Sequence, residues 1–204
     1  MSRLRIAPIV EGHGEYHAIR ILLHRIWYEL VSPQGKSAIE ILRPIRRPRS
    51  RLVQEQELGR AVRLAASKLK VKGDCHSEHC LILILLDAES DPPCQLAPQL
   101  LANASERSGG IDVCCILANV EYETWFVGAA DSLGGDLDLP ERIPQTPEQD
   151  RSGKGWIQRY FKRPRYSETV DQPALTSRMD LDKSRARCPS FDKLCRELEA
   201  RCRD

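Results

Sequence analysis

The sequence has few aromatic residues, almost no excess charge and no long apolar run, and each shortage excludes a class of protein. Aromatic residues make up 5% of the 204 residues, and the formal net charge is only +2. A net charge this small argues against a surface that is basic throughout, as in many proteins that bind nucleic acid or membranes. Any basic surface must therefore be local. No apolar run approaches the roughly 20 residues of a membrane-spanning helix. We therefore expect no membrane partner.

The amino-terminal residues also lack the pattern of a secretory signal. The chain opens "MSRLRIAPIVEG", which passes directly into a strand pattern without a cleavage region. We therefore expect a cytoplasmic protein whose eight cysteines are reduced. The cluster "DCHSEHC" contains residue types that bind zinc, although its spacing matches no usual zinc motif, so a zinc site stays open at Cys75, His76, His79 and Cys80.

What the sequence does contain is an alternation of strand and helix patterns. Strand patterns cover residues 5–10, 38–45, 80–86 and 111–117, and helical spacing covers 15–31, 54–71 and 96–108. This order predicts an α/β fold with a mostly parallel sheet flanked by helices.

The carboxyl-terminal third has a different composition. Residues 131–155 are rich in Gly, Pro, Asp and Gln, which predicts a long surface loop or insertion. Helices are expected at 172–177 and 190–201, the second capped by Ser190. We therefore expect an α/β core over residues 1–130, a loop over 131–155, and a carboxyl-terminal helical extension over 156–204 packed on the core.

The stretch "CLILILLDAESD" is the most informative part of the chain. Residues 80–86 are apolar without a break, and the acids Asp87, Glu89 and Asp91 follow at once. A buried parallel strand delivers such residues to the edge of an α/β sheet, where these folds keep their chemistry. Like charges about 4 Å apart repel by roughly 4 kcal/mol at an effective dielectric near 20. The three acids therefore need a counter-charge, such as a hard divalent cation, or the open solvent of an ordinary acidic turn.

Acids follow two further strand patterns. Glu11 and Glu15 lie in "VEGHGE", where Gly12 permits a tight turn from strand to helix. In "NVEYETWF", Glu121 and Glu123 open a helix. A helix N-terminus accommodates acids through its dipole, so a purely structural role also stays open for these glutamates.

A local basic segment, "RPIRRPRSR", follows the second strand pattern. Its two prolines predict an irregular, extended course. Arginines on an extended segment suit bidentate contacts to phosphates, and a solvated loop is the alternative. The candidate nucleic-acid-binding residues are Arg43, Arg46, Arg47, Arg49 and Arg51.

The three acidic motifs, in the order "VEGHGE", "LLDAESD" and "NVEYETWF", resemble those of the Toprim fold shared by topoisomerases, primases and the overcoming-lysogenisation-defect nucleases. More closely, they resemble an uncharacterised bacterial family related to Toprim, DUF4276. The later "SGKGWIQRY" and "CPSFDKL" are similar to the same family's carboxyl-terminal pattern. The resemblance covers nearly the whole chain and implies a Toprim-like, Rossmann-like fold.

The resemblance also implies roles for individual residues. By similarity to Toprim enzymes, Glu11 is expected to be a general acid or base, and Asp87 and the acid two residues later are expected to hold metal. That acid is Glu89 instead of aspartate, which lengthens the ligand arm and leaves Asp91 as a substitute. Related nucleases add a second glutamate and a downstream lysine, which the resemblance places at Glu15 and Lys154.

Glu121 and Glu123 complete the acids expected at the metal site. Oxygen-only ligands select Mg²⁺ or Mn²⁺ over zinc. A carboxylate cluster holding such a cation can neutralise a phosphate and activate a water without a cysteine or serine nucleophile.

These observations favour a metal-dependent nuclease of the Toprim type, and resemblance suggests a role in defence against phages or mobile elements. The expected partners are nucleic acid and a protein such as an ATPase or another defence component. One alternative is a non-catalytic module that binds a nucleotide, nucleic acid or protein, which the replacement of the second aspartate by Glu89 supports. Another is a phosphoryl-transfer enzyme for small phosphate esters.

Overall fold

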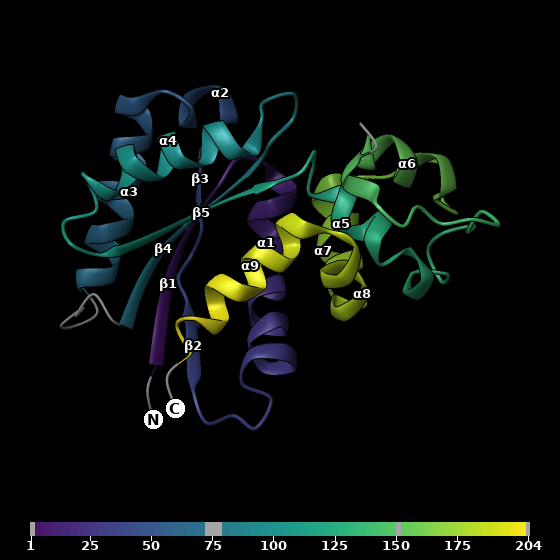
Figure 1. The fold of residues 1–204 in the computed structure, drawn as a ribbon, viewed down its shortest axis with the longest axis horizontal. Coiled ribbons are helices and arrows are strands. Elements are labelled where there is room, and N and C mark those ends of the chain that lie inside the picture. The colour runs from purple at the N-terminus through teal and green to yellow at the C-terminus, as the bar shows by residue number, and fades with distance from the viewer. Residues whose placement is uncertain (1–2, 72–78, 150–151, 203–204) are drawn as a thin grey trace.

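Parallel strands form the centre of the computed structural model, which describes residues 3–71, 79–149 and 152–202 (Figure 1). Within these residues the sheet has the order β2-β1-β4-β5, and β3 pairs with β1 beyond the end of β2. Every strand pairing is parallel, which confirms the expected α/β fold in a Rossmann-like arrangement. The strands are β1 (Arg3–Val10), β2 (Ala38–Ile41), β3 (Ile45–Arg46), β4 (Cys80–Asp87) and β5 (Asp112–Ala118).

Alternate residues of each central strand enter two separate hydrophobic cores. In β4, Leu81, Leu83 and Leu85 face one core, whereas Ile82 and Ile84 face the other. Both faces of a parallel sheet are covered by its crossover helices, so both sets of side chains are apolar. This burial explains why residues 80–86 carry no polar residue.

Helices cover both faces of the sheet (Figure 1). α3 (Glu55–Val71) and α4 (Pro93–Ser105) lie on one face, where their buried residues join the core of Ile82 and Ile84. The other face is covered by α1 (His13–Arg25), which continues as the π-helical turn η1 (Ile26–Val31), and by α9 (Pro189–Glu199). The short helix α2 (Arg49–Leu52) precedes α3.

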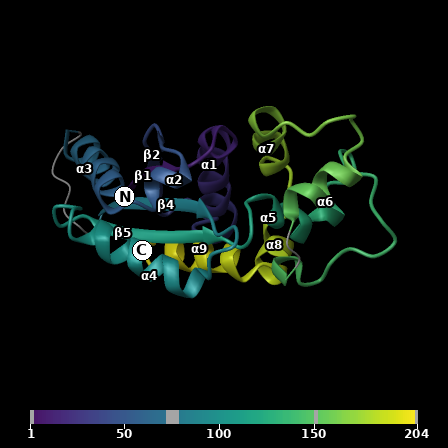
Figure 2. The same cartoon turned by 90° about the horizontal axis from the view of Figure 1, so that it is seen from above.

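The remaining helices gather beyond the carboxyl ends of the central strands, as Figures 1 and 2 show. Trp125 and Phe191, whose rings lie 5.2 Å apart, join this group to α9 and the sheet core. The described parts of residues 123–202 therefore contribute to the same hydrophobic core as the sheet. The group comprises α5 (Glu123–Gly128), η3 (Ala130–Ser132), η4 (Pro147–Gln149), α6 (Gly153–Tyr160), α7 (Glu168–Thr176) and α8 (Leu181–Arg187).

Several predicted local structures differ from the observed ones. The single strand expected over 38–45 is divided into β2 and β3, because Pro44 has no N–H to donate to the ladder. The basic segment is not irregular throughout, since Pro48 is the N-cap of α2 and its fixed φ suits a helix start. Ser190 does not cap α9, whose N-cap is Cys188; its hydroxyl instead binds Trp125 and Glu148. The predicted loop over 131–155 contains η3 and η4 and ends in α6.

The expectation of eight reduced cysteines is wrong at Cys80, which is disulfide-bonded. Six other cysteines are free thiols, and of these only Cys94 is exposed while Cys202 is half-buried. The free thiols are Cys94, Cys114, Cys115, Cys188, Cys195 and Cys202.

No described helix combines the length and the apolar composition needed to span a membrane.

The packing of α9 on the sheet generates a stability prediction. Leu194 is fully buried in the core shared with β5 and η1, so Leu194→Ala should lower the free energy of unfolding by about 2–5 kcal/mol. Arg196→Ala on the same helix removes an exposed ion pair with Asp192 and should change it by less than about 0.5 kcal/mol. Denaturant titration checks both values, and equal effects would contradict the packing described for α9.

Candidate active site

The candidate site lies where the two central strands of the sheet end. β1 connects outward to β2, and β4 connects outward on the other side to β5, so the order in which the chain adds strands to the sheet reverses between the parallel strands β1 and β4. In open α/β sheets, ligands bind outside the carboxyl ends of the strands at such a switch point. Glu11 follows β1 directly and Asp87 is the last residue of β4. The apolar strands therefore bring the first two predicted site residues to this position.

Glu11 and Asp87 are in direct contact. The backbone N–H of Asp87 donates to Oε1 of Glu11 at 2.5 Å, and Oδ1 of Asp87 accepts from the backbone N–H of Tyr122 at 2.8 Å. Burial, helped by the charge of Glu15, raises the pKa of Glu11 to about 7. Burial and then the charge of Glu11 hold the pKa of Asp87 well above its usual value. The two carboxyl groups therefore share a poorly solvated site.

Glu15, in the first turn of α1, adds a third carboxyl group and is 7% exposed. Its Oε1 accepts from Nε2 of Gln172 at 3.2 Å, whereas its Oε2 has no hydrogen-bond partner among the described residues. A Cβ at Gly12 would lie 2.1 Å from this Oε2, so a larger residue there would displace the Glu15 carboxylate from its observed position. An unsatisfied buried carboxylate oxygen is costly and indicates a missing donor or cation.

Glu123, the first residue of α5, is the fourth carboxyl group and is 3% exposed. Its Oε1 accepts from the hydroxyl of Tyr166 at 3.0 Å. Burial raises the pKa of Glu123 to about 7, and the charge of Glu15 contributes. The charge of Glu123 in turn raises the pKa of Asp87. We call Glu11, Glu15, Asp87 and Glu123 the acidic cluster; its members come from all three acidic motifs.

Glu89 and Asp91 have a different partner. Both form ion pairs with Arg49, whose Nη1 lies 3.4 Å from Oε2 of Glu89. The same guanidinium donates to the backbone oxygens of Asp87 at 3.0 Å and Ala88 at 3.2 Å. Arg49 therefore closes the loop after β4, and Glu89 is turned within it by a left-handed backbone with φ +53°. The structure therefore pairs these two predicted metal ligands with Arg49, and the charge of Glu89 still adds to the effect of burial in raising the pKa of Glu11.

Glu121 and Lys154 lie beside each other at the start of α6. Oε2 of Glu121 accepts from the backbone N–H of Lys154 at 2.8 Å, and the Lys154 ammonium pairs with Glu168. The hydrogen bond with Glu168 raises the pKa of Lys154, and the charges of Glu123 and Glu121 add to the effect. The predicted lysine therefore lies within the electrostatic influence of the acidic cluster.

A polar cavity of about 490 Å³ adjoins the loop after β4. Glu148, which no sequence pattern singled out, contributes a carboxyl group to this cavity, and its Oε1 accepts from the backbone N–H of Ser190 at 2.8 Å. The lining residues include Glu89, Asp91, Asn119, Glu121 and Glu148.

Sequence patterns also missed the neutral partners of the acidic cluster. Tyr166 and Gln172 contact Glu123 and Glu15 across 43 and 157 positions of the chain. Both lie in the carboxyl-terminal region, where the surrounding sequence is that of an ordinary helix or loop. No local sequence signal therefore identifies them.

The other arginines of the basic segment do not contact the acidic cluster. Nε of Arg43 donates to the Tyr16 hydroxyl at 2.6 Å, and Arg47 donates to the backbone oxygen of Arg46 at 2.9 Å. Their role in binding nucleic acid, like that of Arg51, stays a prediction. In the candidate zinc cluster, Cys75 and His76 lie outside the described residues.

Within the described residues, no three His, Cys, Asp or Glu side chains are arranged to hold a metal ion as they stand. The donor chemistry of the acidic cluster nevertheless fits a hard divalent cation. Its donors are all carboxylate oxygens, one of them is buried without a partner, and burial followed by the neighbouring carboxylates raises the pKa values of Glu11, Asp87 and Glu123, so a cation would favour their ionised forms. Mg²⁺ or Mn²⁺ would supply that charge.

Comparison with known proteins identifies one family. The model of a domain of unknown function, DUF4276, matches residues 10–199. No curated protein and no solved structure matches the chain.

The raised pKa values predict how the stability of the metal-free protein depends on pH. Glu11 and Glu123 ionise near 4.5 in the unfolded chain and near 7 in the folded protein, so the unfolded state binds fewer protons between these values. Their contribution to the free energy of unfolding is therefore complete below pH 4.5 and is lost as the pH rises to about 7. The loss amounts to up to about 3 kcal/mol for each residue.

Chemical denaturation in EDTA across this pH range checks the prediction. Glu123→Gln should remove part of the slope, whereas Glu106→Gln, at an exposed position on the far end of α4, should leave it unchanged. A wild-type protein whose stability is flat or increases from pH 4.5 to 7 would contradict the burial described for these acids.

Proposed function

The chain belongs to the DUF4276 family of domains of unknown function, and we propose that it is a nuclease of the Toprim type that hydrolyses phosphodiester bonds with Mg²⁺ or Mn²⁺. The observation that carries the proposal is the acidic cluster at the switch point of the sheet, with one buried carboxylate oxygen left without a partner. Acids so placed repel one another unless they are protonated or share a cation.

Asp87, Glu15 and Glu123 are the residues that would hold the cation. A cation bound there neutralises negative charge on a phosphodiester and lowers the pKa of a bound water. The amide N–H of Asp87 holds Oε1 of Glu11 in place, which leaves Oε2 of the same carboxyl group to carry a proton. A carboxyl group with a pKa near 7 suits general acid–base catalysis at neutral pH. Lys154 supplies positive charge for the phosphate when it leaves Glu168.

The wider role extends this proposal. We propose that the protein acts in the cytoplasm in defence against phages or mobile elements, with nucleic acid as substrate and an ATPase or another defence component as partner. Membership of the Toprim clan is supported by the order of the acidic motifs and by the strand ends on which they lie, and the role in defence and its partners are proposed by analogy with that clan.

A non-catalytic binding module is the second candidate, and Arg49 is the observation that favours it. This arginine pairs with Glu89 and Asp91, the acids expected to join Asp87 as metal ligands. An arginine bound by the loop can replace a metal ion as the source of positive charge. In that case the protein would bind a nucleotide, nucleic acid or protein without catalysing a reaction.

The two candidates differ in their response to metal. In the nuclease, millimolar Mn²⁺ or Mg²⁺ should raise the melting temperature, because a ligand at a hundred times its dissociation constant stabilises the native state by about 2.7 kcal/mol. Asp87→Ala should abolish this shift and should leave the metal-free protein as stable as wild type or more so, since it relieves repulsion. Thermal unfolding with EDTA or metal provides the measurement.

Glu11→Gln should separate proton transfer from metal binding. We expect it to lower hydrolysis of bis(p-nitrophenyl) phosphate and of oligonucleotides by at least about a hundredfold, while it keeps part of the metal-dependent shift. Glu106→Gln is the control and should retain full activity. If Asp87→Ala destabilises the metal-free protein and metal shifts both proteins alike, the acids are structural and the binding-module candidate replaces the nuclease.

A further inference from the structure

A basic groove runs along α1 at the edge of the sheet that β2 forms. It consists of two neighbouring cavities of about 680 and 820 Å³ that share Arg20, His24 and Arg43. One wall is the outer edge of β2, the last strand on this side, together with the segment that follows it. Lys68, in the last turn of α3, also lines the larger of the two cavities.

His17, Arg20 and His24 of α1 line the groove, and His13 before them and Tyr28 of η1 after them continue the same spacing of three or four residues. These residues have the spacing of one helix face, and we call them the stripe. Its first member lies two positions before Glu15 of the acidic cluster in the sequence. From the first member to His24 the helix rises about 16 Å, the axial distance of roughly five phosphates on one strand of a duplex. The stripe comprises His13, His17, Arg20, His24 and Tyr28.

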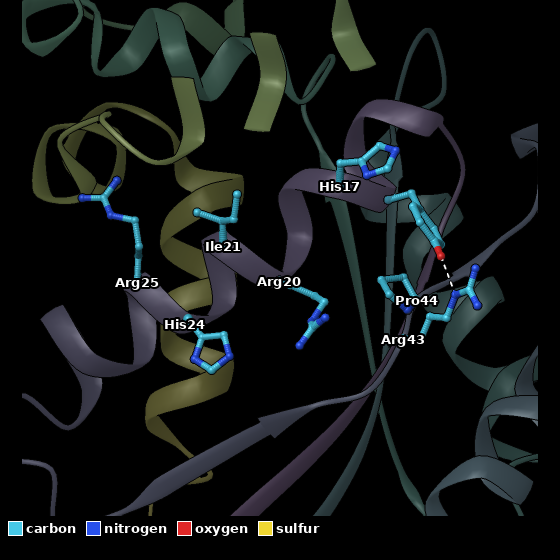
Figure 3. Close-up of a pocket in the computed structure, with 8 residues that line it drawn as sticks. His17, Arg20, Ile21, His24, Arg25, Arg43 and Pro44 are labelled. Carbon is cyan, nitrogen blue, oxygen red and sulfur yellow. Dashed lines mark hydrogen bonds between the residues drawn. The ribbon is translucent and has the colours of Figure 1, made fainter. Parts of the chain in front are cut away.

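The cations of the groove are available to a ligand. Arg20 is exposed and makes no hydrogen bond or ion pair with any described residue. Among the described residues, the Arg43 guanidinium donates only through Nε, to Tyr16, while Lys68 donates to the backbone oxygen of Arg43 at 3.4 Å. Figure 3 shows Arg20 and His24 on one side of α1 and Arg25 extending to the other side. The Arg25 guanidinium is bound to the backbone oxygens of Thr176 and Met179.

The groove is positive overall. Glu40 is the acidic residue among those that line the two cavities, and it pairs with Arg3 at 3.5 Å. Burial and then the charge of Arg20 lower the pKa of His24, as expected for an imidazole in a positive field. A polyanion is the ligand class that fits such a surface.

Aromatic rings accompany the cations. The rings of His24 and Tyr28 stack at 6.0 Å with an interplanar angle of 14°, and Tyr28 is 42% exposed. Near the other end, the rings of Tyr16 and His17 meet edge to face at 5.2 Å. A basic groove that also offers aromatic rings is typical of proteins that bind single-stranded nucleic acid, whose unpaired bases stack on the rings.

We propose that this groove binds a single strand of nucleic acid along α1 and leads it to the acidic cluster. The proposal rests on the proposed nuclease function and specifies its substrate as single-stranded DNA or RNA. Phosphates contact Arg20, Arg43 and Lys68, and bases stack near Tyr28. The strand reaches the site at the N-terminal end of α1, where Glu15 lies.

Binding without catalysis tests the groove directly. The probes are fluorescein-labelled oligothymidylate and oligouridylate of about 12 nucleotides, within the 4–16 that a single-strand-binding fold covers. Fluorescence anisotropy in EDTA measures the dissociation constant at several salt concentrations. Replacing Arg20, Arg43 and Lys68 together with alanine should reduce the log–log salt slope by about 2, since each phosphate contact contributes roughly 0.7 on a single strand.

A matched triple variant controls for net charge. Arg142, Arg159 and Arg165 are exposed, lie outside the groove and form no ion pair with a described residue, so their replacement removes the same charge. This variant should keep the wild-type slope. Equal losses in both triple variants, or no loss in the groove variant, would overturn the proposal. Thermal unfolding confirms that both variants fold.

Tyr28 tests whether the bases of a single strand lie in the groove. Tyr28→Ala should weaken binding about tenfold with an unchanged salt slope, because a stacking surface is lost but no phosphate contact. Tyr28→Phe keeps the ring and should bind as the wild type does. If neither change affects the single strands, and a duplex of the same length binds more tightly than they do, the single-strand assignment is wrong.

The groove and the nuclease proposal fail in different ways. If the groove triple variant loses binding and the wild type hydrolyses no phosphodiester with Mg²⁺ or Mn²⁺, the groove proposal stands and the nuclease proposal fails. If the wild type hydrolyses bis(p-nitrophenyl) phosphate but the triple variant binds oligonucleotides normally, the groove proposal fails and the catalytic one stands.

Discussion

Desolvation of carboxyl groups is the constraint on which the arrangement of this protein depends. Two central strands, buried on both faces, end in Glu11 and Asp87, and the adjoining helices add Glu15 and Glu123. Carboxyl groups withdrawn from water are stable only when they are protonated, hydrogen-bonded or paired with positive charge. The protein provides the hydrogen bonds with backbone N–H groups, Tyr166 and Gln172, but among the described residues no cationic side chain pairs with Glu15.

The carboxyl-terminal helices give the site its enclosure. α5 to α8 lie beyond the strand ends, and α7 supplies Gln172 while the segment before it supplies Tyr166 (Figure 2). Without these residues the acids would face solvent and behave as an ordinary acidic turn. Covering the strand ends is therefore what turns three acidic motifs into a site with perturbed proton affinities.

The arginines near the acids have two different roles. Arg49 neutralises the loop after β4, whereas Arg20, Arg43 and Lys68 line a groove that leads away from the acids along α1. The basic segment predicted from the sequence therefore contains arginines of two kinds: Arg49 is bound within the protein, and Arg43 lies in the groove. Arg20 was outside the predicted set because a single arginine on a helix gives no local signal.

The α/β class, the parallel sheet and the position of acids at three strand ends follow from the sequence alone, because they depend on local patterns. An apolar run without polar residues indicates a strand buried on both faces, and the acid after it marks the strand end. Such patterns contain no information about contacts between distant segments. The pairing of Arg49 with Glu89 and Asp91, and of Gln172 with Glu15, became apparent only in the folded protein. The physical reason is that a carboxyl group's state depends on burial and on partners up to 157 positions away, which the tertiary packing alone brings together.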